Sequence, residues 1–300
     1  MGPARRRERV ALVTGATGFL GSHLAERLVR EGACVHGLVR RGSPVDRLPE
    51  RVRPEEHDGT TTGLCRVMER VRPAEVFHLA ARFVAQEHRP EDVEGLVRDN
   101  VLLSAQLCEA MVAAGSHRLV LAGTAWQHRR EAPEAPVALY AATKQAVDDI
   151  VAYYADATPL RAITLKLYDT YGPGDRRAKL FALLVGAATS GEPLAMSPGE
   201  QLLDLVHVDD VVEAFLTAAA RLERREVAGH ERYTVPAARR YSLREVVALL
   251  GEALGREVPV LWGRRPYRQR EVMVPWDGPS LPGWRARIGL AEGLRTLGAP

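Results

Sequence analysis

Tyr140 and Lys144 stand four positions apart in the segment Tyr-Ala-Ala-Thr-Lys, and together they offer acid–base chemistry. In a helix this spacing places both side chains on one face. A free tyrosine, with a pKa of about 10, is a poor proton carrier at neutral pH, but a nearby ammonium is expected to stabilise the phenolate and lower that pKa. The pair is therefore a candidate site of proton transfer, and a surface contact between the two side chains is the alternative.

A hydroxyl group that could assist this pair belongs to Thr124, which follows a predicted strand at residues 118–121. A hydroxyl beside Tyr140 can polarise a substrate carbonyl by donating a hydrogen bond to its oxygen. A threonine after a strand is also a common turn residue, so a catalytic role for Thr124 is expected only because the Tyr–Lys pair accompanies it in the sequence. The sequence predicts Thr124, Tyr140 and Lys144 as the catalytic residues, with Thr124 also in contact with substrate.

A glycine-rich turn lies between a short apolar segment, residues 10–14, and a segment of helical periodicity, residues 19–30. Small residues in such a turn let the backbone approach a pyrophosphate, and the helix that follows offers unpaired N–H groups at the positive end of its dipole. We therefore predict a dinucleotide site, with a glycine-rich turn that binds nothing as the alternative. Its residues would be Gly15, Thr17, Gly18, Phe19, Leu20 and Gly21.

The residues after the next predicted strand, 35–39, bear on the choice of cofactor. Sites that prefer NAD usually carry a carboxylate there, which binds the ribose 2′-hydroxyl, whereas an arginine suits a 2′-phosphate. Arg40 and Arg41 occupy these positions, and the first acidic residue beyond them is Asp46. The sequence therefore predicts NADP(H) as the cofactor, and a pair of solvated surface arginines is the alternative.

Strand-like and helix-like segments alternate through the first half of the chain, which predicts a parallel sheet covered by helices on both faces. Strands are predicted at residues 10–14, 35–39, 75–79, 118–121 and 162–167, and helices at 19–30, 64–71, 93–114 and 141–155. Shorter elements follow residue 171, with strands at 203–208 and 233–235 and helices at 179–190, 210–222 and 243–254. The predicted fold class is α/β, a Rossmann-type doubly wound parallel sheet with a smaller C-terminal substrate-binding region.

The same pattern predicts how the chain is divided. Residues 1–168 would form the NADP(H)-binding Rossmann domain, and segments near 203–222 would return to it. Residues 169–300 would form mainly the substrate-binding region.

The bulk composition argues against several other classes of protein. A formal net charge of +3 over 300 residues gives no reason to expect nucleic acid as a partner. Cys34, Cys65 and Cys108 are scattered, which argues against a disulfide framework or a metal site and suits a reducing compartment. No apolar run approaches the roughly 20 residues needed to cross a bilayer, and no signal-peptide pattern precedes the first strand. We therefore expect a cytoplasmic protein with no membrane partner.

Further motifs follow in an order that resembles the extended short-chain dehydrogenases/reductases, which often act on nucleotide sugars. Besides the glycine turn, Thr124 and the Tyr–Lys pair, they are His78-Leu79-Ala80-Ala81, Tyr171-Gly172-Pro173 and residues 206–211. The resemblance implies that Asp58 lies near the adenine, that Leu79, Ala80 and Ala81 line the cofactor, and that Lys144 binds the nicotinamide ribose. It also implies a homodimer formed through the two long helices at 93–114 and 141–155.

Within that family the sequence favours one reaction over two others. Dehydratases usually carry an Asp-Glu pair directly after the threonine, where this chain has Ala125 and Trp126, which cannot transfer a proton. The 4-epimerases typically carry an acidic residue where Arg40 stands. Residues 166–172 and 197–201 resemble 4-ketoreductases of deoxysugar pathways, which implies that NADPH reduces a nucleoside-diphosphate-4-keto-6-deoxyhexose.

The diphosphate of such a substrate needs cationic partners. The candidates are Lys179, Arg265, Arg268 and Arg270. Asp169 and Leu203 depart from the family, which often has Asn and a phosphate-binding Arg at these positions. A 4-epimerase, a reductase of a non-sugar carbonyl compound and a non-catalytic NADP-binding protein therefore remain as alternatives, the last disfavoured by the Tyr–Lys pair.

Overall fold

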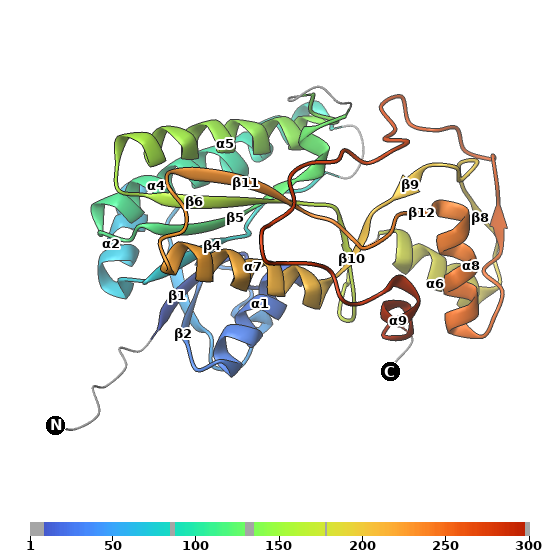
Figure 1. Ribbon diagram of the computed structural model, residues 1–300, viewed down its shortest axis with the longest axis horizontal. Coiled ribbons are helices and arrows are strands. Elements are labelled where there is room, and N and C mark those ends of the chain that lie inside the picture. The colour runs from blue at the N-terminus through green and yellow to red at the C-terminus, as the bar shows by residue number, and fades with distance from the viewer. Residues whose placement is uncertain (1–8, 85–87, 130–134, 178, 298–300) are drawn as a thin grey trace.

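A seven-stranded sheet lies at the centre of the computed structural model, which describes residues 9–84, 88–129, 135–177 and 179–297 (Figure 1). Its strands are all parallel and follow the order β11-β6-β5-β4-β1-β2-β3. They are β1 (Val10–Thr14), β2 (Cys34–Arg40), β3 (Arg53–His57), β4 (Glu75–His78), β5 (Arg118–Thr124), β6 (Arg161–Leu167) and β11 (His230–Val235). The chain order reverses between β1 and β4, and open parallel sheets bind ligands beyond the carboxyl ends of the strands at such a reversal.

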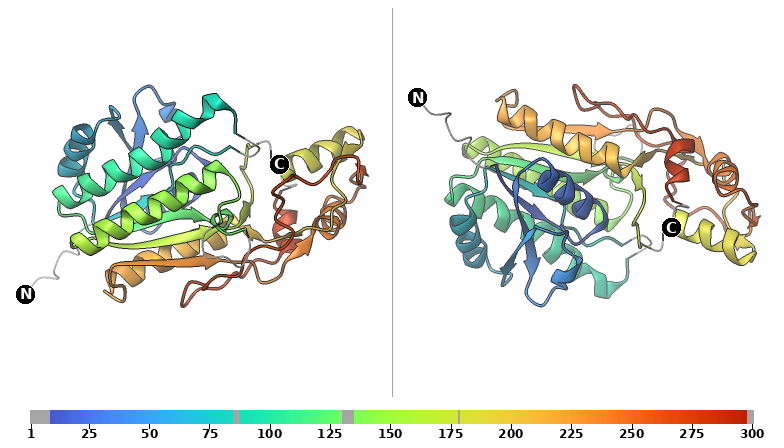
Figure 2. Two further views of the ribbon diagram at one scale, coloured as in Figure 1. Left: turned by 90° about the horizontal axis from the view of Figure 1, so that it is seen from above. Right: turned by 90° about the horizontal axis from the view of Figure 1, so that it is seen from below.

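Helices cover both faces of this sheet (Figure 2). One face carries α1 (Phe19–Arg30) and α7 (Val208–Glu223), and the other carries α2 (Thr61–Val71), α4 (Leu103–Ala113) and α5 (Leu139–Ala157). Leu24 and Phe215 belong to the apolar cluster on the first face, and Leu64, Leu107 and Val147 to the cluster on the second. This arrangement confirms the predicted Rossmann-type doubly wound fold.

The single helix predicted over residues 93–114 is wrong in its middle. The structure has α3 (Val93–Leu96), then a π-helical segment (Val97–Leu102), then α4. The π-helical segment carries Asn100, whose side chain is buried and hydrogen-bonds to segments outside the helix. Such wider turns are frequent at functional sites, because they re-aim one side chain without ending the helix.

The strand predicted over residues 203–208 is interrupted in the structure. The structure divides it into β9 (Leu202–Leu203) and β10 (Leu205–His207), which lie outside the central sheet and pair with β12 (Tyr241–Ser242) and β7 (Asp169–Tyr171). The buried carboxylate of Asp204 separates the two strands. It accepts hydrogen bonds from the Ala237 backbone nitrogen at 2.7 Å and from Arg240 Nε at 3.1 Å, which fix the chain between them.

A smaller region follows the central sheet, on the right of Figure 1. It contains α6 (Leu180–Ser190), α8 (Leu243–Leu254), α9 (Leu290–Arg295) and the paired strands β8 (Leu194–Ala195) and β13 (Val260–Leu261). It has its own apolar cluster, whereas α7 and β11 pack with the central sheet. The division at residue 168 stays a prediction.

In the described ranges no helix is long and apolar enough to span a membrane.

Candidate active site

The glycine turn between β1 and α1 has the shape that a dinucleotide phosphate requires. Gly15 has a φ of +73°, and a Cβ atom there would lie 2.8 Å from the backbone nitrogen of Ala80. A Cβ atom on Gly21 would collide with the carbonyl oxygen of Gly15. Gly18 is the N-cap of α1 and provides no side-chain cap, and the first turn carries no acidic residue. The turn therefore fits the diphosphate of a nicotinamide dinucleotide, which backbone N–H groups at the helix start would hold.

The remaining predicted residues of the turn have different surroundings. Leu20 packs against the apolar cluster beneath α1. The guanidinium of Arg177 lies 4.7 Å from the centre of the Phe19 ring, and Thr17 is partly buried within the turn. Asp175 holds Arg177 by hydrogen bonds of 2.6 Å. Arg177 is a cation beside the glycine turn that the sequence patterns did not single out.

Thr14, the last residue of β1, ties the glycine turn to the end of β4. Its Oγ1 accepts hydrogen bonds from the backbone nitrogens of Leu79 at 3.2 Å and Ala80 at 3.0 Å, and it is hydrogen-bonded to His78 Nδ1 at 2.8 Å. Burial, and secondarily the charge of Lys144, lowers the pKa of His78 to about 3. This histidine is therefore neutral. It has a structural role in placing residues 79–81, which the family resemblance assigns to the cofactor.

Buried polar side chains continue this connection to the predicted catalytic helix. His78 Nε2 is hydrogen-bonded to Ser104 Oγ at 2.8 Å, and Ser104 donates to the Asn100 carbonyl oxygen. Asn100 Nδ2 donates to Thr143 Oγ1 at 2.9 Å, and Thr143 donates to the Tyr140 carbonyl oxygen at 2.7 Å. We call Thr14, His78, Ser104, Asn100 and Thr143 the polar chain. It runs from the carboxyl end of β1 to the first turn of α5, and local sequence patterns did not reveal it.

Tyr140 and Lys144 lie in the first two turns of α5. Lys144 is buried, and its Nζ donates a hydrogen bond of 2.9 Å to the Ala122 carbonyl oxygen on β5. Burial lowers the pKa of Lys144 to about 8, although the negative charge of Asp148 acts to raise it. Burial raises the pKa of Tyr140 to about 12. The expectation of a lowered tyrosine pKa is therefore wrong, because desolvation of the phenolate outweighs the attraction of nearby cations.

These two pKa values predict the pH dependence of the free protein's activity. Lys144 is an ammonium below pH 8 and loses its charge above it, while Tyr140 stays protonated until about pH 12. If the reaction needs the ammonium and the neutral phenol, kcat/KM should be constant at neutral pH and fall with a single limb near pH 8. A pH profile of kcat/KM checks this. A profile without that falling limb would contradict the role assigned to Lys144.

Thr124 ends β5 and is buried. Its Oγ1 accepts a hydrogen bond of 3.3 Å from the backbone nitrogen of Trp126, and its own backbone nitrogen donates to Gln127 Oε1 at 3.0 Å. Thr124 therefore caps the short 3-10 turn that follows, as a turn residue would. A hydroxyl that accepts one hydrogen bond still has its proton to donate, so the capping role is compatible with polarising a carbonyl.

Three aromatic rings meet at the start of α5. The Phe83 ring packs edge-on against the Tyr140 ring with centroids 5.0 Å apart, and it lies 6.1 Å from the Trp126 ring. Lys179 Nζ lies 4.7 Å from the centre of the Phe83 ring. Lys179, a predicted substrate ligand, thus packs on the same ring as Tyr140. Phe83 was not predicted, because a single aromatic residue in a loop after a strand gives no pattern that marks a ligand site.

The residues predicted to bind the adenosine end lie at the carboxyl ends of β2 and β3. Arg40 is exposed, with its Nη1 3.4 Å from Asp99 Oδ2, and Arg41 is exposed beside it. Asp58 Oδ1 accepts hydrogen bonds from the backbone nitrogen of Thr60 at 2.9 Å and from its hydroxyl at 2.6 Å. These hydrogen bonds hold the pKa of Asp58 below its usual value. Asp58 therefore stabilises the start of α2, in addition to any role toward a ligand.

The three predicted arginines of the C-terminal segment are all exposed. Arg270 Nε donates to the Val137 carbonyl oxygen at 2.8 Å, and its Nη2 donates to that of Pro136 at 2.6 Å. The backbone nitrogen of Arg265 donates to the Met196 carbonyl oxygen, and that of Arg268 to Glu271 Oε2. The guanidinium of Arg270 thus fastens the C-terminal segment to the residues before α5.

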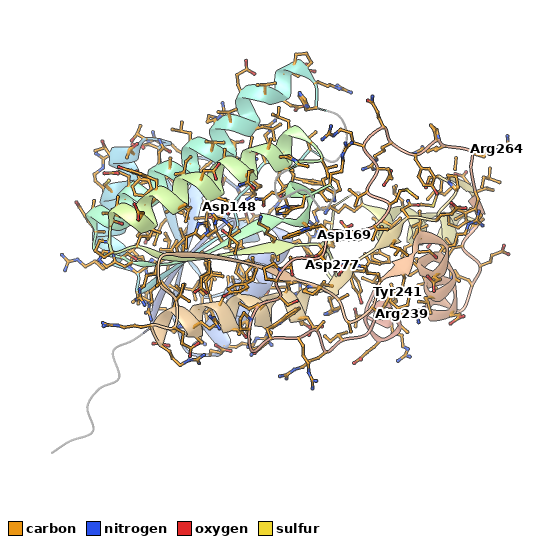
Figure 3. The ribbon with its side chains drawn as sticks, turned by 45° about the horizontal axis from the view of Figure 1, so that its top comes forward. Asp148, Asp169, Arg239, Tyr241, Arg264 and Asp277 are labelled. Atoms are coloured by element: carbon orange, nitrogen blue, oxygen red, sulfur yellow. The ribbon has the colours of Figure 1, made fainter. Side chains whose placement is uncertain are left out.

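A buried carboxylate lies behind the Tyr–Lys pair. Asp148, labelled on α5 in Figure 3, is 1% exposed. It accepts hydrogen bonds from Gln127 Nε2 at 2.8 Å and Thr164 Oγ1 at 2.7 Å. Lys166 Nζ and Arg232 Nε each lie 3.7 Å from Asp148 Oδ2. The carboxylate of Asp148 thus neutralises the charges of Lys166 and Arg232 between the sheet and α5.

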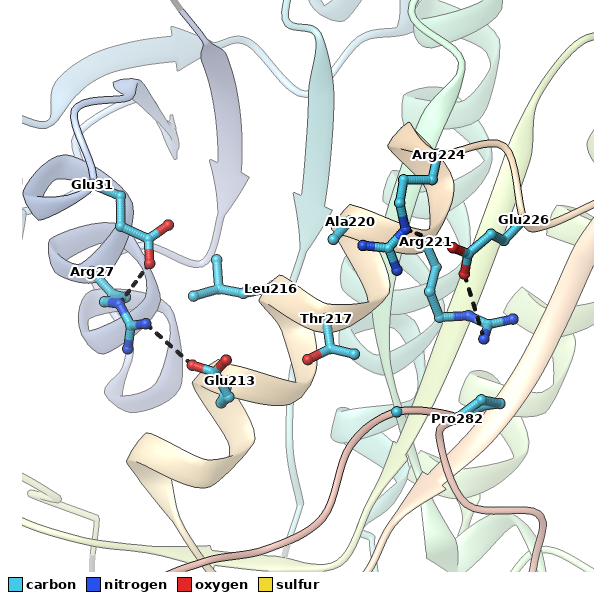
Figure 4. A pocket seen from close by; sticks show the side chains of 11 residues that line it. Arg27, Glu31, Glu213, Leu216, Thr217, Ala220, Arg221, Arg224, Glu226 and Pro282 are labelled. Carbon is cyan, nitrogen blue, oxygen red and sulfur yellow. Dashed lines mark hydrogen bonds and ion pairs between the residues drawn. The ribbon is translucent and has the colours of Figure 1, made fainter.

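A cavity of about 400 Å³ lies on the opposite face of the sheet, beside α1 and α7 (Figure 4). Its lining charges pair with one another: Arg27 with Glu31 and Glu213, and Glu226 with Arg221 and Arg224. Guanidinium groups already held by carboxylates offer little to an anionic ligand. None of the residues that line this cavity is a predicted site residue, so it is separate from the candidate active site.

A doubly wound parallel sheet, a glycine turn at its topological reversal and a Tyr–Lys pair on one face of α5 define an NAD(P)-dependent oxidoreductase of the short-chain dehydrogenase/reductase class. Residues 11–233 match the NAD dependent epimerase/dehydratase family, and the chain belongs to this family.

Relatives in this family modify nucleotide sugars, as the sequence motifs predicted. The chain is 31% identical to a dTDP-6-deoxy-L-talose 4-dehydrogenase (NAD(P)(+)) of Kitasatospora kifunensis, over 96% of this chain and 94% of that protein. It is 25% identical to a CDP-abequose synthase of Yersinia pseudotuberculosis, over 88% and 90% of the two chains. The structure of MoeE5 in complex with UDP-glucuronic acid and NAD is similar, with a TM-score of 0.81, 30% identity and coverage of 96% and 97%. Other relatives are 4-epimerases.

Proposed function

We propose that this protein is an NADPH-dependent 4-ketoreductase that acts on a nucleoside-diphosphate-4-keto-6-deoxyhexose in deoxysugar biosynthesis. The observation that carries the proposal is the set of side chains around the Tyr–Lys pair of α5: Tyr140 can donate a proton, whereas Ala125 and Trp126, directly after Thr124, cannot transfer one. A protonated phenol can give a proton to a carbonyl oxygen that is being reduced. Arg40 stands where 4-epimerases typically carry an acidic residue, which argues against an epimerase. The names of the relatives in Kitasatospora and Yersinia support this substrate class.

The residues of the chain have separate tasks in this reaction. A bound nicotinamide dinucleotide supplies the hydride that reduces the C4 carbonyl carbon. Tyr140 donates its phenolic proton to the C4 oxygen, and the Thr124 hydroxyl donates a hydrogen bond to the same oxygen. Lys144, one turn along α5, keeps a positive charge on this helix face while the phenolate is formed. The carbonyl becomes an alcohol, and the phenolate regains a proton from solvent.

The cofactor preference follows from the end of β2. A surface pair such as Arg40–Asp99 contributes only about 0–1 kcal/mol, so Arg40 is available to a 2′-phosphate. Arg40→Asp should weaken NADPH binding by about 10- to 100-fold, because a hydrogen bond to a charged group is lost and repulsion is added. Fluorescence titration of NADPH and NADH on both proteins measures this. Arg285→Asp, at an exposed position in the C-terminal segment, is the matched control. A wild-type preference for NADH would contradict the assignment.

The reaction is tested by incubating the protein with NADPH and a nucleoside-diphosphate-4-keto-6-deoxyhexose. The expected result is stoichiometric consumption of NADPH and a single C4 alcohol, identified by NMR. Interconversion of two sugar nucleotides without net cofactor consumption would instead identify an epimerase. Turnover only with other carbonyl compounds would identify a reductase of a different substrate class. Cofactor binding without any turnover would identify a non-catalytic cofactor-binding protein.

We also propose a homodimer formed through the helices around residues 93–113 and α5, in the cytoplasm. Val97, Leu102 and Tyr153 on these helices are large apolar or aromatic side chains with exposed fractions of 46%, 47% and 66%. Burial of such side chains favours association. The three cysteines are free thiols, which suits a reducing compartment.

A further inference from the structure

An aromatic wall, which we define as Phe83 and Trp126, stands beside the catalytic tyrosine. Phe83 remains 40% exposed although it packs edge-on against Tyr140, and Trp126 is partly buried. The exposed part of the Phe83 ring is therefore available to a ligand that binds beside Tyr140. The position of this ring, against the residue that delivers the proton, indicates that the ligand is the substrate.

The wall is held in place by hydrogen bonds of the backbone on both sides. Asn100 Oδ1 accepts from the backbone nitrogen of Arg82 at 2.7 Å, and Asn100 Nδ2 donates to the Arg82 carbonyl oxygen at 3.1 Å, so the residue before Phe83 is fixed twice. The Trp126 carbonyl oxygen accepts from the backbone nitrogen of Val137 at 2.8 Å. Both rings are therefore carried by segments whose backbone is held in place. A surface that is held in this way can discriminate between substrates.

The position of C4 in the hexose ring determines which substituents of the sugar can contact the aromatic wall. When C4 reacts at Tyr140, its two flanking ring carbons, C3 and C5, must lie close to the same residue. C3 carries a hydroxyl, and C5 carries C6. Covering a hydroxyl with aromatic carbon leaves it without a hydrogen-bond partner, which is unfavourable, whereas covering a methyl group is favourable.

We propose that the aromatic wall determines specificity by contacting C6 of the hexose, and that it selects substrates in which C6 is a methyl group over those in which it is a hydroxymethyl or a carboxylate. This proposal rests on the proposed function and identifies the residues that read the 6-deoxy group. Phe83 is its main element, because it is the ring that touches both Tyr140 and Trp126.

Lys179 offers an alternative to contact between C6 and the aromatic wall, because its charge could bind an anionic group of the substrate. Its ammonium lies over the Phe83 ring, and burial, together with the charge of Arg177, lowers its pKa. An ammonium at this position would attract a C6 carboxylate if C6 lay on its side of the ring. It would attract the diphosphate if the sugar lay on the other side. A ligand series that includes a hexuronate therefore distinguishes the two arrangements.

The test uses three nucleotide sugars with the same base and the same hexose configuration, which differ only in a methyl, hydroxymethyl or carboxylate group at C6. Dissociation constants are measured by calorimetry in the presence of NADP⁺, so that the preference is read without turnover. The variants are Phe83→Leu, which keeps an apolar side chain, and Phe83→Gln, which introduces a polar one. Leu261→Gln, on β13 and 47% exposed, is the matched control for the polar substitution.

The wild type should bind the methyl compound about 10- to 100-fold more tightly than the hydroxymethyl compound, the range available to an apolar pocket. Phe83→Leu should retain most of this preference, Phe83→Gln should reduce it to a few-fold or less, and Leu261→Gln should leave it unchanged. Equal binding of the methyl and hydroxymethyl compounds, or an unchanged preference in Phe83→Gln, would overturn the proposal. Tightest binding of the carboxylate, lost in Lys179→Met, would overturn it in favour of a uronate. Absence of turnover with a normal binding preference would refute only the proposed reaction.

Discussion

Tyr140→Phe should reduce the rate of NADPH oxidation with the 4-keto sugar by about 10²- to 10⁴-fold, the usual contribution of general acid–base catalysis. The substitution removes only the hydroxyl that donates the proton. The ring remains, and so does its edge-on contact with Phe83. The backbone carbonyl of residue 140 still accepts the hydrogen bond from Thr143. Cofactor binding and thermal stability should therefore be close to those of the wild type.

The measurement is single-turnover kinetics with saturating NADPH, accompanied by a cofactor titration and a melting curve. The chain offers a matched control in Tyr154→Phe. This tyrosine is on the same helix, and its pKa is also raised to about 12 by burial, but its hydroxyl donates to Glu109 at 2.8 Å. The control should retain wild-type turnover. If Tyr140→Phe kept more than about a tenth of the activity, the proton would have to come from another group.

Asp148→Ala should lower the free energy of unfolding by about 3–5 kcal/mol, because it leaves the cations around it uncompensated. Lys166 carries most of this cost, since its side chain is 5% exposed, whereas that of Arg232 is 37% exposed and retains solvent. The hydrogen bonds from Gln127 and Thr164 are lost as well. Urea denaturation monitored by circular dichroism measures the loss.

Asp149→Ala is the matched control for this prediction, because Asp149 is the next residue of α5 and is exposed. It should leave the unfolding free energy nearly unchanged. A double variant, Asp148→Ala with Lys166→Met, should recover part of the stability, since it removes the main uncompensated charge. A loss below about 1 kcal/mol in Asp148→Ala would contradict the stabilising role assigned to this carboxylate.

Sequence patterns predicted those parts of the fold and the site that local chemistry determines. A Cβ atom on Gly21 would collide with Gly15, six residues earlier, so the spacing of these two glycines is visible in the sequence. The Tyr–Lys pair is one helical turn apart and needs no tertiary information. The alternation of strands and helices followed from apolar periodicity in β1, β4, β5 and β6.

The parts that sequence patterns missed depend on distant contacts. β3 is an edge strand of sequence Arg-Pro-Glu-Glu-His, and its polar composition gives no apolar signal. The π-helical turn exists because Asn100 meets Arg82 and Thr143, which are 18 and 43 residues away. The raised pKa of Tyr140 reflects burial under other segments, whereas its sequence neighbours suggested only the opposing effect of a charge.

The polar chain from Thr14 to Thr143 has a consequence for how this protein can change. It joins the end of β1, next to the glycine turn, to the first turns of α5 by a continuous series of hydrogen bonds. The region around α6 and α8 has a separate apolar core, to which no residue of the polar chain belongs. Residues of the region around α6 and α8 can therefore change in evolution with little effect on the polar chain, whereas a change at Phe83, which follows the Arg82 held by Asn100, would affect both sugar contact and this hydrogen-bonded unit.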